Sequence, residues 1–493
     1  MYTQPDQSEI DDFFNESRIT KFANASDKLP PFIPIQAQHI YGLLRLNNEL
    51  EQPQDSRRAI QLLEVYDLYC KSAEKAALNT GAQLIEMQGN LIHVVLPSAQ
   101  ANHRDVIAFC KAFDEGVNRR VRPKAGNNFR AFSMASYHGP AVIVRDEAFG
   151  VISEVSLGIA ANRPAKKLLG TPSVPNGHVA IPTHQVSGAA GRSSWTEFDL
   201  TNESSNTLGE NIHYFEKVAS AFDSELPPAP SFDFEARSFD RGTNFASSAP
   251  LQTYGFCLKS DMDGFSKKVE VAWSEGSVEK LVFEFHSIMK AADAFTAGFN
   301  KPIIRIPWAG DCSTLIFPSE TISEYNQARS VTPVRAASEW NDSVSLSEDY
   351  RSSVKWAHAA AGCDVGNSSN GNVIVARLDG QRREFPIAVG PGVKLARDGE
   401  QADGLNGGEM AIHRHDDLKR LDDVHRSKFH DFTNKSGQTN SNFKKASSAD
   451  LKVSVAEEAK RAVGAIAAVG IGTTTSASIQ IPKPKVYGQS SRS

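Results

Sequence analysis

Hydrophobic and polar positions alternate along this chain with two periods, and the same order of periods occurs twice. In the first half, apolar residues recur every three to four positions over 59–76, as expected for a helix with one buried face. Apolar runs at 82–87 and 91–96 are typical of two strands, and the Gly-Asn pair between them indicates the turn of a hairpin. A further strand is predicted at 129–137.

The second half repeats this order with little sequence similarity. A strand is predicted at 254–259 and a helix at 278–289, and runs at 303–307 and 313–317 form a second hairpin that turns at a Gly-Asp pair. A strand at 354–361 follows, and each half then has a glycine-centred junction from strand to helix. This β-α-β-β-α-β order predicts an α+β fold of two tandem ferredoxin-like palm domains, each with helices on one face of an antiparallel sheet.

Composition divides the chain into five parts. Residues 1–31 are polar and are expected to form an N-terminal arm, and the two globular units are expected at 32–219 and 251–425. The segment 220–250 is rich in Pro, Ser and acidic residues, as linkers are. The rest, 426–493, has the composition of a polar, low-complexity tail that lies outside both cores.

The bulk properties exclude several classes of protein. The chain has 493 residues, of which 40% are hydrophobic, so each unit can bury a core. Its formal net charge is −5 and its basic residues are spread out, so nucleic acid is not an expected partner. Its five scattered cysteines are typical of reduced core residues. The N-terminus does not resemble a secretion signal and the longest apolar run, 462–471, is too short to span a bilayer, which favours a cytoplasmic protein without a membrane anchor.

Two acidic residues of the second unit are candidate metal ligands. Asp261 directly follows a predicted strand, and Asp311 lies in the turn of the next hairpin. If these strands are neighbours, both carboxylates emerge at the same end of the sheet, where hard oxygen ligands can hold Mg²⁺ or Mn²⁺. Paired ions of this kind serve phosphoryl transfer. Taken singly, either residue could instead cap a helix or stabilise a turn.

The segment DMDGFS, which begins at Asp261 and precedes WAGDC, resembles the metal-binding pattern of the class III nucleotidyl cyclases. The resemblance implies that Asp261 and Asp311 bind two Mg²⁺ or Mn²⁺ ions and that the carbonyl of Met262 adds an oxygen ligand. Asp263 falls at a variable position of the pattern, so we do not expect it to be a ligand.

The first unit is similar to another segment of the same family, in which Gly, Asn and Arg are spaced four residues apart. This chain has Gly158, Asn162 and Lys166 at those positions. The resemblance implies that the amide and the cation face the phosphates, where preplaced donors stabilise the growing negative charge. Lys in place of Arg keeps the charge but loses the bidentate fork. The alternative is an ordinary helix start with both side chains in solvent.

Each unit lacks what the other keeps. In the first unit the metal-binding positions align with about His39 and with Asn90, and in the second the amide and cation positions carry Lys394 and Asp398. Head-to-tail pairing of two such domains creates two clefts. One would hold both catalytic sets, and the other would hold only the four replacements. The expected assembly is therefore a pseudo-heterodimer within one chain, or a homodimer.

The family reads the base three residues before the hairpin glycine, where this chain has Glu86. A carboxylate accepts a hydrogen bond from guanine N1–H, uracil N3–H or a cytosine amino group, whereas adenylyl cyclases carry Lys here. Val155 and Ser156 stand where adenylyl cyclases carry an acid, and we expect Ser156 to contact the substrate. The alternative is that Glu86 faces solvent on its strand.

With these motifs and no recognisable partner domain, the chain resembles the pyrimidine cyclases of Pycsar antiphage defence. The resemblance implies conversion of UTP to 3′,5′-cyclic UMP and pyrophosphate, and a separate effector protein that the cyclic nucleotide activates. A cytidylate, guanylate or adenylate cyclase remains an alternative. A catalytically silent nucleotide-binding sensor is the alternative from another class.

Overall fold

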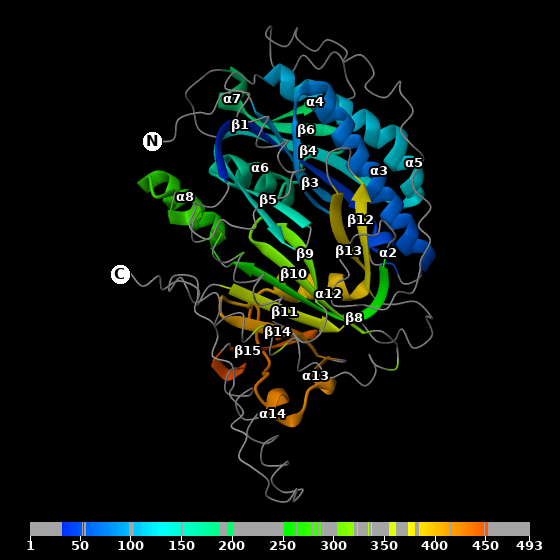
Figure 1. Cartoon of the computed structure of the whole chain (residues 1–493), viewed down its shortest axis with the longest axis vertical. Helices are drawn as coiled ribbons and strands as arrows, with labels where there is room; N and C mark the ends of the chain where they lie inside the picture. The colour runs from blue at the N-terminus through cyan, green and yellow to red at the C-terminus, as the bar shows by residue number, and fades with distance from the viewer. Residues whose placement is uncertain are drawn as a thin grey trace, which may run out of the picture.

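The computed structural model describes most of residues 32–200 and 251–451, and its longest internal gaps are 290–302, 338–353 and 361–372. The expected N-terminal arm and linker lie outside the described residues, as does the end of the chain from residue 452. Within the described parts, strands form two sheets, one in each half of the chain (Figure 1).

The first unit contains a sheet with the strand order β2-β3-β1-β4-β6-β7, and β5 pairs with β4. Its elements are β1 (Phe32–Leu46), α2 (Asn48–Glu51), α3 (Ser56–Thr80), β2 (Gln83–Gln88), β3 (Leu91–Pro97), α4 (His103–Gly116), α5 (Arg122–Ala125), β4 (Phe129–Ala148), β5 (Val151–Leu157), α6 (Ile159–Leu169), β6 (His178–Pro182), α7 (Thr183–Ser187) and β7 (Trp195–Asp199).

The second unit contains the order β9-β10-β8-β11-β14-β15, and the hairpin β12-β13 is attached to the start of β8. Its elements are β8 (Leu251–Met262), α8 (Phe265–Glu275), β9 (Ile304–Ala309), β10 (Cys312–Ser319), β11 (Val354–Ala360), β12 (Val373–Asp379), β13 (Glu384–Val389), α12 (Pro391–Glu400), β14 (Glu409–His413), α13 (Asp417–Arg420), α14 (Asp423–Arg426) and β15 (Phe443–Ser447).

The two sheets have the same topology, as the repeated order of elements predicts. The hairpin β2-β3 flanks β1 as β9-β10 flanks β8, and the pairs β4·β6 and β11·β14 are both parallel. In each unit a strand, β5 or β13, ends at a glycine that begins a helix, α6 or α12. The predicted α+β class and the tandem arrangement of two palm domains are therefore confirmed.

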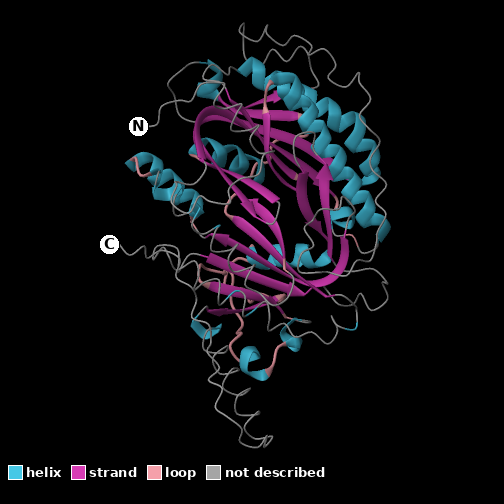
Figure 2. Cartoon of the chain, in the orientation of Figure 1, coloured by secondary structure: helices cyan, strands magenta, loops and turns pink. Residues whose placement is uncertain are grey.

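Each unit inserts a pair of strands into the core of the other. Val142 on β4 and Leu157 on β5 are fully buried, and they belong to the apolar core that contains Phe256 of the second unit. In return, Phe385 and Ile387 on β13 are buried in the core that α3 and α4 complete in the first unit. Figure 2 shows the long helices along the outer side of the first sheet. The strands of the two units lie next to each other in the middle of the molecule. Because of this exchange, each of the two cores contains residues of both units and extends across the interface.

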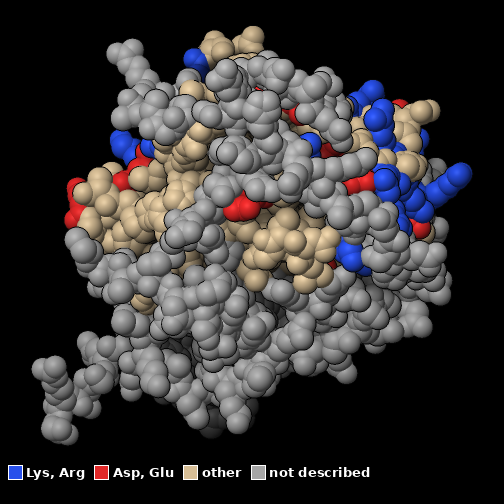
Figure 3. Space-filling view, turned by 90° about the horizontal axis from the view of Figure 1, so that it is seen from above, with Lys and Arg blue, Asp and Glu red and all other residues tan. Residues whose placement is uncertain are grey.

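The second unit extends beyond residue 425, where the sequence suggested that a tail begins. Strand β15 pairs antiparallel with β14, and Phe443 and Ala446 are buried. The run around β15 is polar because Lys444, Lys445 and Ser447 of this last strand are only partly buried, so its composition resembles a tail. On the face shown in Figure 3, acidic side chains lie beside the basic ones.

The exchanged strands predict a stability effect that crosses the interface. Leu157→Ala removes a side chain that is 0% exposed from the shared core and is expected to lower the free energy of unfolding by about 2–5 kcal/mol. Leu169→Ala, at a side chain that is 62% exposed, is the matched control and is expected to change it by about 0.5 kcal/mol or less. Urea denaturation followed by circular dichroism measures both. Equal effects of the two variants would contradict the shared core.

Candidate active site

The structure brings the two predicted acids together at one end of the second sheet. The ladder between β8 and β10 ends at Ser260 and Ser313, and the next residue on each strand, Asp261 and Cys312, is joined to the other by a hydrogen bond. Gly310 has a φ of +62°, so it forms the tight turn that presents Asp311 beside them. One ligand atom from each of Asp261, Asp311 and Cys312 lies within 4.8 Å of the others.

This cluster has the donors and the charge that suit a divalent metal ion. The pKa of Asp311 is raised well above its usual value, first by loss of hydration and then by the charge of Asp261, and Glu400 and Glu86 raise it further. Its own backbone hydrogen bond partly offsets these effects. Bringing several carboxylates together is unfavourable without a cation, and two carboxylates are the oxygen donors that Mg²⁺ and Mn²⁺ prefer. Asp261 and Asp311 therefore fit a divalent ion.

Cys312 is the third member of this cluster, and the sequence motifs alone did not single it out. Its thiol donates a hydrogen bond to Asp261 Oδ1 at 3.0 Å. Burial raises the pKa of the thiol well above its usual value, so Cys312 is a neutral donor that holds one carboxylate oxygen in place. The expectation that cysteines are reduced core residues holds for Cys70, Cys110 and Cys257, which are buried, but Cys312 borders the site.

Asn162 lies in the first turns of α6, which begins directly after Gly158. A Cβ on Gly158 would lie 2.7 Å from the Pro140 carbonyl oxygen, so close strand packing requires glycine here. The Asn162 Nδ2 atom is buried and has no hydrogen-bond partner within the part of the chain that the structure describes. An unpaired buried amide is costly, and it is therefore a candidate donor to a ligand.

Lys166, one turn further along α6, reaches across to the second unit. Its Nζ lies 3.5 Å from Glu270 on α8, the helix that follows Asp261, and both side chains are about half exposed. On the same helix, Trp273 Nε1 donates to the Leu157 carbonyl oxygen at 3.3 Å, next to the start of α6. The helix with the predicted amide and cation is thus held against the helix that follows the first predicted metal ligand.

Glu86 is 8% exposed on β2 and does not face solvent. Its carboxylate accepts a hydrogen bond from the Gln88 side chain. Its negative charge acts on residues on both sides of the interface. It raises the pKa of Tyr41 in its own unit and contributes to the raised pKa of Asp311 in the other. The alternative of a solvent-facing Glu86 is therefore excluded.

Ser156 is also buried, but it faces a different environment. Its hydroxyl lies 3.5 Å from His39 Nδ1, and His39 lies 3.1 Å from His93 Nε2. Burial lowers the pKa of His39 to about 3, with a smaller effect from His138, so the imidazole is neutral. Ser156 is not among the residues that line the cavity described next, and its expected contact with substrate stays a prediction.

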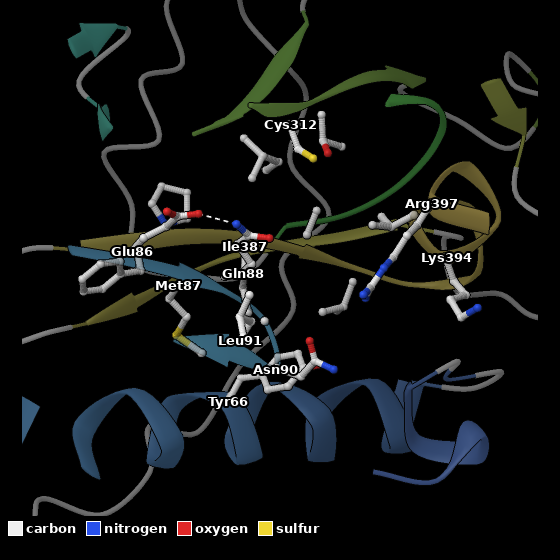
Figure 4. A pocket seen from close by; sticks show the side chains of 18 of the residues that line it. Tyr66, Glu86, Met87, Gln88, Asn90, Leu91, Cys312, Ile387, Lys394 and Arg397 are labelled. Atoms are coloured by element: carbon white, nitrogen blue, oxygen red, sulfur yellow. Dashed lines mark hydrogen bonds between the residues drawn. The ribbon is translucent and has the colours of Figure 1, made fainter. Parts of the chain in front are cut away.

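A cavity of about 310 Å³ lies between the two units. Figure 4 shows Glu86 and Cys312 toward one end, Lys394 and Arg397 toward the other, and Asn90 and Tyr66 along one wall. The hairpin β2-β3 and α3 supply the wall of the first unit, and the hairpin β12-β13 with α12 supplies the wall of the second. Glu86, the residue predicted to read the base, therefore lines the space between the units.

The register corrects one alignment. Leu91, which follows Asn90, pairs with Leu43, just as Cys312, which follows Asp311, lies opposite Asp261. Leu43 therefore occupies the first metal-binding position of the first unit, not His39. The sequence misled because β1 is apolar at most positions, so it carries no alternation that would fix the register. Leu43, like Asn90, lines the cavity, whereas His39 does not.

Four more charged residues line the cavity that the motifs did not identify: Glu51, Glu154, Lys259 and Arg397. Glu154 makes a buried ion pair with Arg145 at 2.9 Å, and its signal in the sequence is an acid within an otherwise apolar strand. Lys259 is two residues before Asp261 on the same strand, so the two side chains lie on the same face of the sheet. The signal for Lys259 in the sequence is a charged residue two positions before a predicted metal ligand on the same strand.

Comparison with known proteins identifies the fold. No protein-family model and no curated protein matches the chain. The crystal structure of a class III adenylyl cyclase-like ATP-binding protein from Pseudomonas aeruginosa matches with a TM-score of 0.64 at 15% identity, over 92% of this chain and 100% of that chain. The adenylyl cyclase CyaB from P. aeruginosa matches with a TM-score of 0.26 at 15% identity, over 31% of this chain and 80% of that chain. The guanylyl cyclase Cya2 matches with a TM-score of 0.25 at 13% identity, over 34% of this chain and 92% of that chain.

The first of these likenesses extends over both units, so the chain has the class III cyclase fold, with two palm domains paired as a pseudo-heterodimer. Among the residues that the structure describes, none of the helices combines the length and the apolar character that a membrane span needs.

The acid cluster predicts a response to metal ions that is independent of activity. Because the folded chain holds Asp311 with a raised pKa, the metal-free protein is stabilised at acidic pH and loses that stabilisation as the pH rises above the usual Asp value of about 4. At neutral pH, Mn²⁺ at a hundred times its Kd should restore about 2.7 kcal/mol. Differential scanning calorimetry with Mn²⁺ or EDTA measures this.

Asp311→Asn should abolish the shift produced by Mn²⁺ and should raise the stability of the metal-free protein at neutral pH, because it removes the repulsion with Asp261. Asp398→Asn, in the degenerate cleft, should leave the Mn²⁺ response unchanged. A response that survives in Asp311→Asn would show that the metal binds elsewhere.

Proposed function

We propose that this chain is a nucleotidyl cyclase that converts UTP to 3′,5′-cyclic UMP and pyrophosphate in the cleft between its two units. The observation that carries the proposal is the convergence of Asp261 and Asp311 at the end of β8. The helix that follows Asp261, α8, is paired through Glu270 with Lys166 on α6 of the other unit. Neither unit contains both sets of residues. The reaction therefore needs the pairing of the two palms that the exchanged strands enforce.

In the proposed reaction the ribose 3′-oxygen forms a bond to the α-phosphorus, and the bond from that phosphorus to the bridging oxygen of pyrophosphate breaks. Asp261, Asp311 and the carbonyl of Met262 would hold the Mg²⁺ or Mn²⁺ ions. When bound, these ions supply Lewis acidity that lowers the pKa of the ribose hydroxyl. The cysteine thiol on Asp261 Oδ1 restricts the rotation of that carboxylate.

The first unit would supply the donors to the phosphates. The unpaired Nδ2 of Asn162 orients the ribose and the α-phosphate, and the ammonium of Lys166 compensates the charge that grows on the phosphate oxygens. The pair of Lys166 with Glu270 is half exposed, and such pairs contribute only about 0–1 kcal/mol, so a triphosphate can displace Glu270 at little cost.

Glu86 would select the base. Its carboxylate accepts a hydrogen bond from Gln88, and because a carboxylate can accept several hydrogen bonds, a ring N–H of the base can donate to it as well. Uracil and guanine both offer such a group, and the resemblance to the pyrimidine cyclases favours uracil. Nucleoside triphosphates are cytoplasmic metabolites, so the enzyme would act in the cytoplasm. It would supply cyclic UMP to a separate effector protein in antiphage defence.

The second candidate function is a catalytically silent nucleotide-binding sensor. The observation that favours it is the likeness over both units to a protein that is described as a class III adenylyl cyclase-like ATP-binding protein. Lys394 and Asp398 also pair with each other in the second cleft rather than facing a ligand. Tight binding of a triphosphate without release of pyrophosphate would support the sensor over the enzyme.

Incubation of the chain with each of the four triphosphates and Mn²⁺ tests the activity. UTP should give cyclic UMP and pyrophosphate, and Asp311→Asn and Asn162→Ala should each lower kcat by a factor of about 10²–10⁴, as loss of a group that acts in the transition state does. The products are measured by chromatography. Because both catalytic sets come from one chain, a mixture of the two variants should recover no activity; recovery would show a cleft between chains.

The role of Glu86 predicts a change in specificity. Glu86→Gln keeps the size of the side chain but replaces the carboxylate acceptor by an amide, so kcat/KM for UTP should fall by about tenfold or more, the effect of losing a hydrogen bond to a charged group. Glu154→Gln, at the neighbouring ion pair, tests whether any loss of charge in the cavity has this effect. Unchanged discrimination among the four triphosphates in Glu86→Gln would exclude Glu86 as the base reader.

A further inference from the structure

The cavity between the units has an end that the proposed reaction does not use. This end lies between Asn90, in the turn of the hairpin β2-β3, and two cations of α12, Lys394 and Arg397. Figure 4 shows Arg397 extending from α12 into the cavity, with Asn90 and Tyr66 on the opposite wall. None of the three residues belongs to the acid cluster or to the donors on α6.

The charges at this end differ in sign from those at the catalytic end. Leu43 and Asn90 occupy the two metal-binding positions of the first unit, so no carboxylate pair is present there to hold a cation or to repel an anion. Lys394 is compensated by its pair with Asp398. Arg397 makes no ion pair with any residue that the structure describes, although it lines the cavity.

The surroundings of Arg397 place its charge next to an aromatic wall. Burial raises the pKa of Tyr66, the charge of Glu51 raises it further, and the charge of Arg397 acts in the opposite direction. Glu51 also lines the cavity and is the acid whose charge acts on Tyr66. The charge of Arg397 therefore acts across the cavity on the phenol of Tyr66.

Much of the remaining wall of the cavity is apolar. Leu62, Tyr66 and Met87 line it from the first unit, with Met87 on the side of Glu86 in Figure 4, and Phe385 and Ile387 line it from the second. The whole cavity, with a volume of about 310 Å³, is at the lower end of the range for sites that bind small organic molecules, which is roughly 300–1,000 Å³. An apolar wall with one uncompensated cation fits a small molecule that combines a planar ring with a single anionic group.

We propose that this end of the cavity binds a mononucleotide without a metal ion, with its phosphate group on Arg397 and the Asn90 amide and its base against the apolar wall. A single guanidinium suits a single phosphate group, with which it forms charge-assisted hydrogen bonds. A nucleoside 5′-monophosphate and a cyclic mononucleotide share this chemistry. The proposal does not depend on cyclase activity, because it uses none of the residues assigned to catalysis.

Isothermal titration calorimetry on the full chain in EDTA tests the site with three probes: UMP, cyclic UMP and inorganic phosphate. EDTA removes the metal-dependent binding that the acid cluster would support. We expect one molecule of UMP or of cyclic UMP to bind per chain. The nucleotide that binds more tightly shows whether the ligand is a nucleoside 5′-monophosphate or a cyclic mononucleotide. Inorganic phosphate alone should bind at least tenfold more weakly, because it lacks the ring.

Arg397→Gln should weaken binding of the tighter nucleotide at least tenfold, whereas Asp311→Asn should leave it unchanged. Circular dichroism checks that each variant is folded. If Arg397→Gln does not fold, Asn90→Asp serves instead, because a carboxylate of the same size in the turn repels the phosphate group and should weaken binding to a similar extent.

Three results would overturn the proposal: no binding of either nucleotide in EDTA, phosphate binding as tight as nucleotide binding, or a loss of affinity in Glu86→Gln but not in Arg397→Gln. The last result would place the nucleotide at the catalytic end. A chain that makes no cyclic nucleotide but binds UMP through Arg397 would contradict the proposed enzyme and leave this site intact, so the two proposals fail separately.

Discussion

The mutual exchange of strands between the units is the interaction on which the rest of the structure depends. Leu157 completes the core of the second unit, and Phe385 completes the core of the first. Each exchanged strand ends at a glycine that begins α6 or α12. The packing that joins the units therefore also sets the position of both helices that face the space between them. Because buried apolar surface fixes this geometry, α6 is held against α8 without help from the half-exposed pair of Lys166 and Glu270.

Pairing two copies of one fold creates two equivalent positions for every element. In this chain the two equivalent positions carry different residues and different charges. At one, the carboxylates of Asp261 and Asp311 concentrate negative charge. At the other, Leu43 and Asn90 replace them, and Arg397 brings a cation one residue away from the position where the family pattern has its own. Once a single cleft is sufficient for catalysis, the second is free of the demand for metal ligands, and its charges can serve another ligand.

The sequence predicted what depends on local physics. Helical spacing and the two glycine turns follow from short-range rules, so the palm topology could be inferred. The acid after a strand and the acid in the second turn likewise allowed the convergence of Asp261 and Asp311 to be inferred. The remainder depends on tertiary contacts. The register of β1 placed Leu43, not His39, opposite the hairpin, and β15 is too polar to resemble a core strand. The contact of Cys312 with Asp261 follows only from the pairing of β8 with β10.

The acid cluster and the cavity beside it, which share Cys312, place opposite demands on an anion. Around Asp311 the charges of Asp261, Glu86 and Glu400 repel a phosphate group until a cation neutralises them. Around Arg397 a phosphate group is attracted with no cation present. Interaction between charges strengthens as water is excluded, so this contrast is larger inside the cavity than on the surface. Metal binding at the acid cluster would thus change whether the cluster or the Arg397 end of the cavity is the more favourable place for a phosphate group, and that change would need no movement of the two units.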